Sequence, residues 1–358
     1  MKKKPSSRVK TLDGIRCIAV TMVVVGHALP ATISYEFLPF DFIGRASTGV
    51  TLFFVLSGYL ITSTFLHREN FSLLDFFKKR ILRLWPTLYV YLFFLFILNY
   101  GFDFEIGNWQ HFVAASLHLW NYSLPYVSEL DRYQTAAAHM MHLWSLAMEE
   151  QFYYIWPLIF FSIKSSQILV RVVVLSILVI PILRLISYSE FQSLRPFVSK
   201  FFHTAAEPLL FGCLLALLAN PIISCAPWVL RKWVLPFSLI LLISVSYFVA
   251  RPLSSYWSLT LGPSIESLIA CSIILSAHRG ARGRFHEFLE LSPIQIVGLA
   301  SYSIYIWQNI FTRPYAVFDM PFAPSVGVCF LVGIMSYHIV ESPVMKYRAN
   351  KFSHSRIE

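Results

Sequence analysis

The chain has 358 residues, of which 56% are hydrophobic and only 13% are charged, and its formal net charge is +10. A composition this apolar excludes a water-soluble globular protein and predicts an integral membrane protein. The positive charge is spread over several short segments, so it favours contact with anionic membrane lipids and argues against a nucleic-acid partner.

Ten apolar segments are long enough to cross a bilayer, since about 20 apolar residues span its hydrocarbon core as a helix. Continuous apolar runs indicate helices, because the strands of a transmembrane barrel alternate apolar and polar residues. We therefore expect residues 1–358 to form one membrane domain, an all-α polytopic bundle of about ten transmembrane helices. The expected spans are 12–30, 46–66, 83–100, 142–163, 168–187, 203–219, 233–250, 259–277, 296–312 and 323–340.

Lysine and arginine are distributed unevenly between the two sides of these spans. Of the 29 basic residues, 21 fall in one set of alternating segments, six in the other set and two within spans. Cytoplasmic segments collect lysine and arginine during insertion. The distribution therefore predicts that both termini are cytoplasmic.

The first span carries two ionisable side chains, Arg16 and His27, and each costs a few kcal/mol inside hydrocarbon. Their separation places both on one helical face, about 16 Å apart along the axis. Alternatively, an arginine near a span end can reach lipid phosphates, and a lone histidine can be a satisfied structural residue. The shared face favours a functional pair, with a ligand's charged head held near Arg16 and its reactive end near His27.

A basic segment joins the second and third spans, and it contains Arg80 and Arg83 one helical turn apart. Guanidinium groups bind phosphate oxygens bidentately, so this pair fits a phosphate-bearing ligand. Basic residues also flank any span on its cytoplasmic side, and for these two residues alone that explanation is the stronger one.

The largest polar insertion, at about residues 101–141, is expected on the outer side, where it is the best candidate for contact with an acceptor substrate. Trp109, Val113, Leu117 and Trp120 recur in it at helical spacing. This pattern predicts a short amphipathic helix at the membrane interface.

The fourth span carries adjacent carboxylates, Glu149 and Glu150, of which one can point into the bundle. Glu149 is expected at a depth similar to that of His27, where a carboxylate can hold an imidazole in its basic tautomer. A buried carboxylate can equally mark a proton or cation pathway, so transport is the competing function. The five cysteines form no close-spaced metal or redox motif, and we expect no metal cofactor.

Five motifs, in chain order, resemble those of the integral-membrane acyltransferase 3 family, and together they cover nearly the whole chain. They are R-x10-H from Arg16 to His27, FFVLSGYLIT at 53–62, R-x-x-R at Arg80 and Arg83, WSL at Trp144–Leu146 followed by Glu149, Tyr153 and Pro157, and the C-terminal patterns at 301–305 and 341–343.

This resemblance implies a multi-pass enzyme of the bacterial inner membrane that moves an acyl group, usually acetyl, from cytoplasmic acyl-CoA to a hydroxyl group. The acceptor would be a cell-surface carbohydrate or glycolipid, such as lipopolysaccharide O-antigen. A transporter or acyl-group exporter that uses the same buried charges is the alternative. The sequence indicates no oligomeric state.

The resemblance also assigns roles to individual residues. His27 would be the general base or a transient carrier of the acyl group, with Glu149 orienting it; the sequence does not separate these two roles. The residues expected to bind the phosphates of acetyl-CoA are Arg16, Arg80 and Arg83, and those expected to bind substrate are Trp144, Ser145 and Tyr153.

Two departures from the family pattern stand out. Gln308 occupies a position where many relatives have histidine, and glutamine forms hydrogen bonds but does not titrate near neutral pH. The chain is also expected to lack the soluble esterase-like domain that some relatives carry after the last span.

Overall fold

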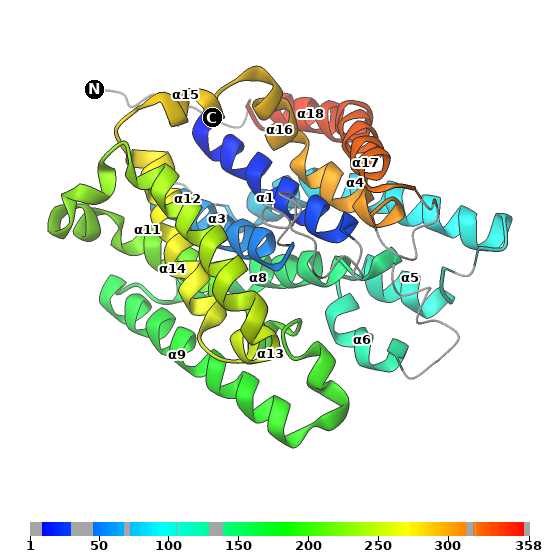
Figure 1. Cartoon of the computed structure of the whole chain (residues 1–358), viewed down its shortest axis with the longest axis horizontal. Coiled ribbons are helices and arrows are strands. Elements are labelled where there is room, and N and C mark those ends of the chain that lie inside the picture. The colour runs from blue at the N-terminus through cyan, green and yellow to red at the C-terminus, as the bar shows by residue number, and fades with distance from the viewer. Residues whose placement is uncertain are drawn as a thin grey trace.

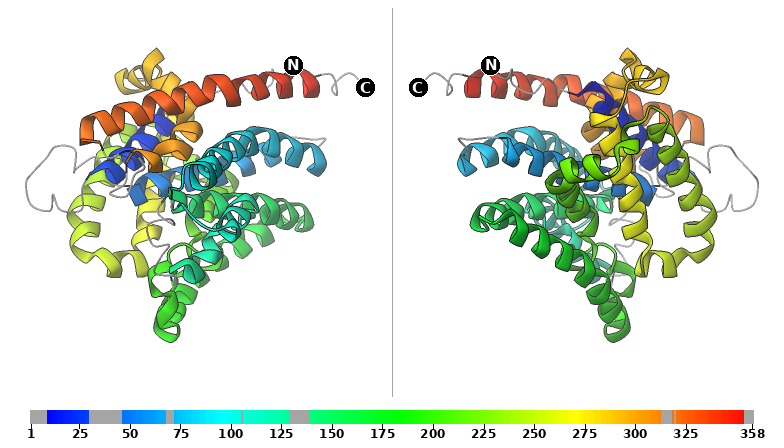
Figure 2. Two further views of the ribbon diagram at one scale, coloured as in Figure 1. Left: turned by 90° about the vertical axis from the view of Figure 1, so that its right-hand side faces the viewer. Right: turned by 90° about the vertical axis from the view of Figure 1, so that its left-hand side faces the viewer.

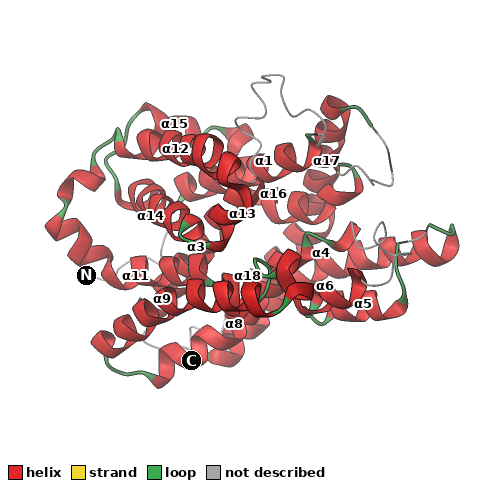
Figure 3. Ribbon diagram, turned by 60° about the horizontal axis from the view of Figure 1, so that its bottom comes forward, coloured by secondary structure: helices red, strands yellow, loops and turns green. Residues whose placement is uncertain are grey.

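The computed structural model describes residues 9–29, 46–67, 72–104, 106–128, 139–312, 318 and 320–353. Every regular element in these ranges is helical (Figure 3), so the all-α prediction is confirmed.

The long helices are α1 (Lys10–Ala28), α3 (Ala46–Leu66), α4 (Leu73–Gly101), α8 (Leu143–Ser162), α9 (Ser166–Glu190), α11 (Glu207–Cys225), α14 (Gly262–Arg279), α16 (Ser292–Trp307) and α17 (Phe322–Ser336). The shorter α-helices are α5 (Trp109–Ser116), α6 (Trp120–Ser128), α10 (Phe202–Ala205), α12 (Val234–Ser244), α13 (Arg251–Leu259), α15 (Arg284–Leu289) and α18 (Ser342–Ser353). The 3-10 helices are η2 (Gln192–Phe197), η3 (Pro227–Leu230) and η5 (Gln308–Ile310), and the π-helices are η4 (Val245–Ala250) and η6 (Tyr337–Glu341).

Each of the ten expected spans contains a helix, but within the described ranges six helices meet the length and apolarity needed to cross a membrane. These six are α1, α3, α4, α9, α11 and the continuous helix Phe322–Lys351. Several long apolar helices support a multi-pass membrane protein, whereas a count of ten stays a prediction. The terminal residues 1–8 and 354–358 lie outside the described residues, so the cytoplasmic orientation of both ends also stays a prediction.

The third expected span begins earlier than the hydropathy indicates. Helix α4 starts at Leu73, ten residues before the expected start, and the Ser72 hydroxyl caps it by accepting a hydrogen bond from the Asp75 backbone N–H at 3.2 Å. The charges around Arg80 lower the local hydropathy without interrupting the helix. Arg80 and Arg83 therefore lie inside α4, whereas they were expected in a basic segment that joins the second and third spans.

Helix α1 lies within the bundle and packs against α3 and α16, while α3 packs against α11 (Figure 1). The α3–α11 contact is made by two glycines whose missing side chains let the backbones meet. A Cβ atom on Gly58 would lie 2.0 Å from the Leu209 carbonyl oxygen, and one on Gly212 would lie 2.1 Å from that of Val55. This close approach fixes how α3, which lines the candidate site, sits in the bundle.

The C-terminal helix is long and nearly straight in both views of Figure 2, where α17 and α18 run from orange to red. Its middle turn is the π-helix η6, a geometry that is common at functional sites. Buried Glu341 ends this turn and accepts a hydrogen bond of 2.8 Å from the Ser303 hydroxyl of α16. Helix α18 then packs against α4.

The amphipathic helix expected in the 101–141 insertion is present as two helices, α5 and α6. Trp109, Val113 and Leu117 are exposed, as expected for an interfacial face. The helix breaks near His118, which has a φ of 56°, and Trp120 is buried on α6. Residues 105 and 129–138 of this insertion lie outside the described residues.

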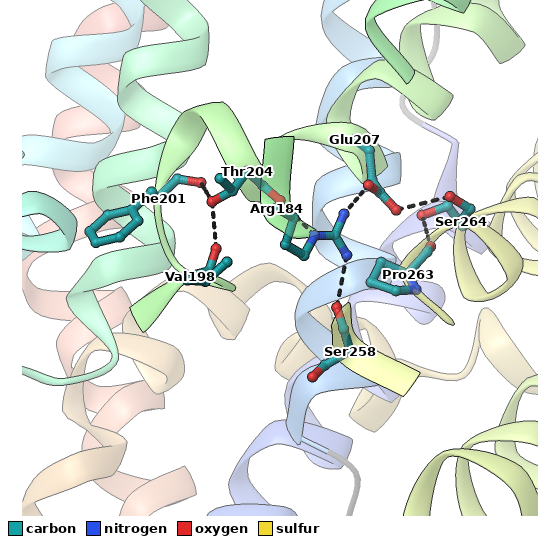
Figure 4. Close-up of polar contacts among 9 residues, drawn as sticks. Arg184, Val198, Phe201, Thr204, Glu207, Ser258, Pro263 and Ser264 are labelled. Carbon is teal, nitrogen blue, oxygen red and sulfur yellow. Dashed lines mark hydrogen bonds and ion pairs between the residues drawn. The ribbon is translucent and has the colours of Figure 1, made fainter. Parts of the chain in front are cut away.

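A buried ion pair joins α9 to α11, as the close-up in Figure 4 shows. Arg184 is paired with Glu207, and the guanidinium also donates to the carbonyl oxygens of Thr204 and Ser258, both at 2.8 Å. Glu207 accepts a further hydrogen bond of 2.9 Å from the Ser264 hydroxyl. The two side chains are 1% and 0% exposed, so neither charge has water as an alternative partner.

Candidate functional site

A cavity of about 300 Å³ opens between α1, α3, α4, α8 and α16. Its polar and charged lining residues are Arg16, Ser57, Thr64, Arg80, Arg83, Ser145, Glu149, Tyr153, Ser301, Tyr302 and Tyr305. The cavity is elongated, since its lining on α3 extends from Val50 to Thr64, which corresponds to about 21 Å of helix rise. Such a shape fits an extended ligand.

Three arginines from two helices contribute to this lining, Arg16 from α1 and Arg80 with Arg83 from α4. Arg16 donates to Asp13 at 2.5 Å, and the Arg80 guanidinium lies 4.2 Å from the centre of the Tyr153 ring. The Nε atom of Arg83 is buried without a hydrogen-bond partner among the described residues. The structure thus brings together the three arginines expected to bind phosphate, and leaves donor capacity on one of them.

One further charged residue near these arginines, Arg348, was not singled out from the sequence. Arg348 on α18 interacts electrostatically with Arg80, Arg83 and Glu341, and its guanidinium donates to the Lys79 carbonyl oxygen at 3.1 Å. Arg348 is one of four basic residues that follow the last expected span. In the sequence, only its position seven residues after Glu341 distinguishes it from the others.

Glu149 lies in the cavity lining and accepts hydrogen bonds from the hydroxyl groups of Ser57 and Tyr153. The Tyr153 hydroxyl is also 3.3 Å from Ser57 Oγ, so the three groups form one polar cluster. The neighbouring carboxylate, Glu150, is 2% exposed and does not line the cavity. Of the two adjacent glutamates, the one selected from the sequence is therefore the one that reaches the cavity.

The other two expected substrate residues differ in position. The Ser145 hydroxyl lines the cavity and is 2.5 Å from the Tyr305 hydroxyl, which in turn donates to the His142 carbonyl oxygen. Trp144 does not line the cavity; it packs edge-on against Phe54, with ring centres 6.1 Å apart. Its effect on a ligand would be exerted through Phe54, which is part of the lining.

His27 lies at the end of α1, beyond the described lining of the cavity. Its Nδ1 atom is 3.1 Å from Oε1 of Gln308, a residue that is completely buried. The expected orienting partner was Glu149, whereas the hydrogen bonds of Glu149 described above go to Ser57 and Tyr153. A role for Glu149 in orienting His27 therefore stays a prediction.

The site thus combines three arginines in the lining of an elongated cavity, the Glu149 carboxylate in the same lining, and His27 farther along α1. Cations suit a phosphate-bearing ligand, and a neutral imidazole can take a proton or act as a nucleophile. No group of three or more potential metal-binding side chains occurs in the part of the chain that the structure describes.

Sequence comparison shows that this chain is similar to known proteins over most of its length. A family model described as "Acyltransferase domain" matches residues 9–337. No solved structure matches the chain.

The curated relatives include three bacterial proteins, each 28% identical to this chain. The O-acetyltransferase OatA of Staphylococcus aureus aligns with 94% of this chain and 57% of its own length. The peptidoglycan O-acetyltransferase OatA of Listeria monocytogenes aligns with 94% of this chain and 56% of its own length, and the putative peptidoglycan O-acetyltransferase YrhL of Bacillus subtilis with 96% and 56%. The chain thus spans little more than half the length of the curated relatives that it matches.

Proposed function

Because the chain belongs to the acyltransferase 3 family, whose model it matches over residues 9–337, we propose that it is a membrane O-acyltransferase. In this proposal, the enzyme lies in a bacterial inner membrane and transfers an acetyl group from cytoplasmic acetyl-CoA to a carbohydrate hydroxyl on the outer side.

The observation that carries this proposal is the elongated cavity with Arg16, Arg80 and Arg83 in its lining. Coenzyme A has phosphate groups at one end and a long thioester arm, so its charged and extended parts correspond to the two features of the cavity. Guanidinium groups bind phosphate oxygens with strong, bidentate hydrogen bonds. The Nε atom of Arg83, which has no hydrogen-bond partner among the described residues, supports a role in binding such an anion.

The proposed reaction uses His27 at the outer end of α1. As a general base, His27 would take the proton of the acceptor hydroxyl while the hydroxyl oxygen attacks the thioester carbonyl; the carbon–sulfur bond breaks, and the departing thiolate takes the proton. As a nucleophile, the imidazole would first attack the thioester carbonyl and release the coenzyme A thiolate. The acceptor hydroxyl oxygen would then attack the acetyl-imidazole, the carbon–nitrogen bond would break, and the hydroxyl proton would pass to the imidazole. We propose that Glu149, which accepts hydrogen bonds from Ser57 and Tyr153, positions the thioester arm of acetyl-CoA relative to His27.

The acceptor is proposed to be a glycan of the cell envelope. The names of two relatives given above specify peptidoglycan, and none of the three names lipopolysaccharide. Peptidoglycan is therefore the first acceptor to test, with lipopolysaccharide O-antigen as the second.

The proposal is tested by measuring free thiol released from acetyl-CoA by the purified protein in nanodiscs, together with acetyl ester formed on peptidoglycan fragments or O-antigen. Transfer requires both products in equal amounts. Absence of ester on every envelope glycan tested would contradict the proposal. A flux of acetyl groups across liposomes without ester formation would instead favour the transporter.

Replacing Arg83 with glutamine is expected to weaken the binding of coenzyme A about 10- to 100-fold, because a hydrogen bond to a charged group contributes about 1.5–3 kcal/mol. Isothermal titration calorimetry with the nanodisc-embedded protein measures the change. Arg282→Gln is the matched control, since this arginine is 76% exposed and pairs with Glu290 outside the cavity. Equal weakening in both variants would show that general surface charge, not the cavity, attracts the ligand.

Arg348→Gln is expected to weaken coenzyme A binding as well, by a smaller factor than Arg83→Gln, because Arg348 acts on the site from α18 and does not line the cavity. The same titration measures it, at low and high salt. The loss should shrink as salt rises, since screening weakens a longer-range interaction first. A loss that does not depend on salt would indicate that Arg348 acts only through its hydrogen bond to Lys79.

A further inference from the structure

Gln308 is the first residue of η5, where α16 tightens into a 3-10 turn, and its side chain is completely buried. The side-chain oxygen, Oε1, is 3.1 Å from Nδ1 of His27. This contact joins residues 281 positions apart in the chain.

The backbone holds Gln308 firmly in place. Its carbonyl oxygen accepts hydrogen bonds from the Phe311 and Thr312 backbone N–H groups at 2.9 and 3.0 Å, and from the Thr312 hydroxyl at 2.8 Å. Ten residues earlier, near the middle of α16, this helix approaches α1 closely, because a Cβ atom on Gly298 would lie 2.0 Å from the Asp13 carbonyl oxygen. The turn therefore fixes the backbone at Gln308, and the Gly298 contact sets the register of α16 against α1, so that Gln308 is presented to His27.

The chemistry of this contact determines which histidine nitrogen is basic. An amide oxygen only accepts hydrogen bonds, so the Nδ1 atom that faces it must carry the proton. In a neutral imidazole the other nitrogen, Nε2, then keeps its lone pair. A neutral amide achieves this without placing a further charge in the bundle.

We propose that Gln308 is the positioning residue for His27: it holds Nδ1 protonated and leaves Nε2 as the nitrogen that acts on the acceptor hydroxyl or on the acetyl group. The inference rests on the proposed acyltransferase function and assigns to Gln308 the orienting role that the sequence suggested for Glu149. Glu149 and its partners Ser57 and Tyr153 then belong to the donor cavity.

The tautomer is measured directly, without reference to activity, by magic-angle-spinning NMR of the full protein labelled with ¹⁵N-histidine in lipid. The His27 signals are assigned as those absent from His27→Asn. The expected spectrum at neutral pH shows a protonated Nδ1 and an unprotonated Nε2. The opposite tautomer would overturn the proposal. It would mean that the side-chain amide nitrogen of Gln308 donates a hydrogen bond to an unprotonated Nδ1 of His27.

The functional arm compares variants of Gln308 in the transfer assay. Gln308→Met keeps the length of the side chain but removes the amide acceptor. By analogy with groups that orient metal-binding histidines, whose loss costs about 10- to 100-fold, it should lower kcat by a factor of that size with little change in the KM for acetyl-CoA. Gln308→Glu restores an acceptor and should recover most of this loss. Thr312→Val disturbs the same turn without touching the amide and should keep the wild-type tautomer and most of the activity.

The outcomes separate this inference from the function on which it rests. Full activity in Gln308→Met, or a Gln308→Glu variant as slow as Gln308→Met, would overturn the positioning role in an active enzyme. If the wild-type protein acetylates no glycan, the proposed function fails, and the NMR spectrum still decides whether Gln308 sets the tautomer of His27.

Discussion

His27→Ala is expected to lower the rate of acetyl transfer about 100- to 10,000-fold, because a positioned proton-transfer group contributes a factor of that size. Binding of coenzyme A should persist, since His27 lies beyond the described cavity lining that contains Arg16, Arg80 and Arg83. Single-turnover measurement of ester formation, combined with calorimetric binding of coenzyme A, separates the two effects. The histidine is thus predicted to act on the reaction and not on donor affinity.

The matched control for this variant is His338→Ala, which removes an exposed histidine of η6 that does not line the cavity. It should leave transfer unchanged. A His27→Ala protein that transfers at the wild-type rate, or that loses coenzyme A binding in parallel with transfer, would contradict the assigned role.

The same protein distinguishes a base from an acyl carrier. Incubation with radiolabelled acetyl-CoA in the absence of an acceptor should label the protein if the imidazole of His27 accepts the acetyl group, and His27→Ala should remove that label. Transfer without any labelled intermediate indicates that His27 acts as a general base.

Local pattern was enough to predict the helical class, because each expected span is a continuous apolar run and each contains a helix. It was also enough to select the residues that meet in the cavity: Arg80 and Arg83 share a helical face at i, i+3, and Glu149 and Tyr153 share one at i, i+4. The hydroxyl of Tyr153 does donate to Glu149. Helical periodicity is a short-range property that the sequence displays directly.

The contacts between distant segments could not be predicted in this way. Gln308 meets His27 only because α1 and α16 pack closely at Gly298, and Arg348 approaches Arg83 only because α18 packs against α4. Hydropathy also misplaced the start of α4, since the charges of residues 78–83 lower the average in a segment that remains helical. Register between helices depends on side-chain volume at the contacts, which composition and periodicity do not encode.

The buried pair of Arg184 and Glu207 provides the largest expected effect on stability. Arg184→Met leaves the Glu207 carboxylate buried without its cation, and breaking a buried pair by removing one partner costs about 3–5 kcal/mol. The free energy of unfolding, measured by denaturant titration in mixed micelles, should fall by that amount. Arg282→Gln, which breaks an exposed pair, should change it by about 0–1 kcal/mol.

The double variant Arg184→Met with Glu207→Gln tests whether the cost comes from the uncompensated charge. It should be more stable than Arg184→Met alone, because no ionised side chain remains buried at this site, although the carbonyl oxygens of Thr204 and Ser258 still lose their donor. A double variant no more stable than the single one would assign the loss to those two hydrogen bonds and to packing. A higher free energy of unfolding in the double variant would show that each charge is tolerated between α9 and α11 because the opposite charge is present.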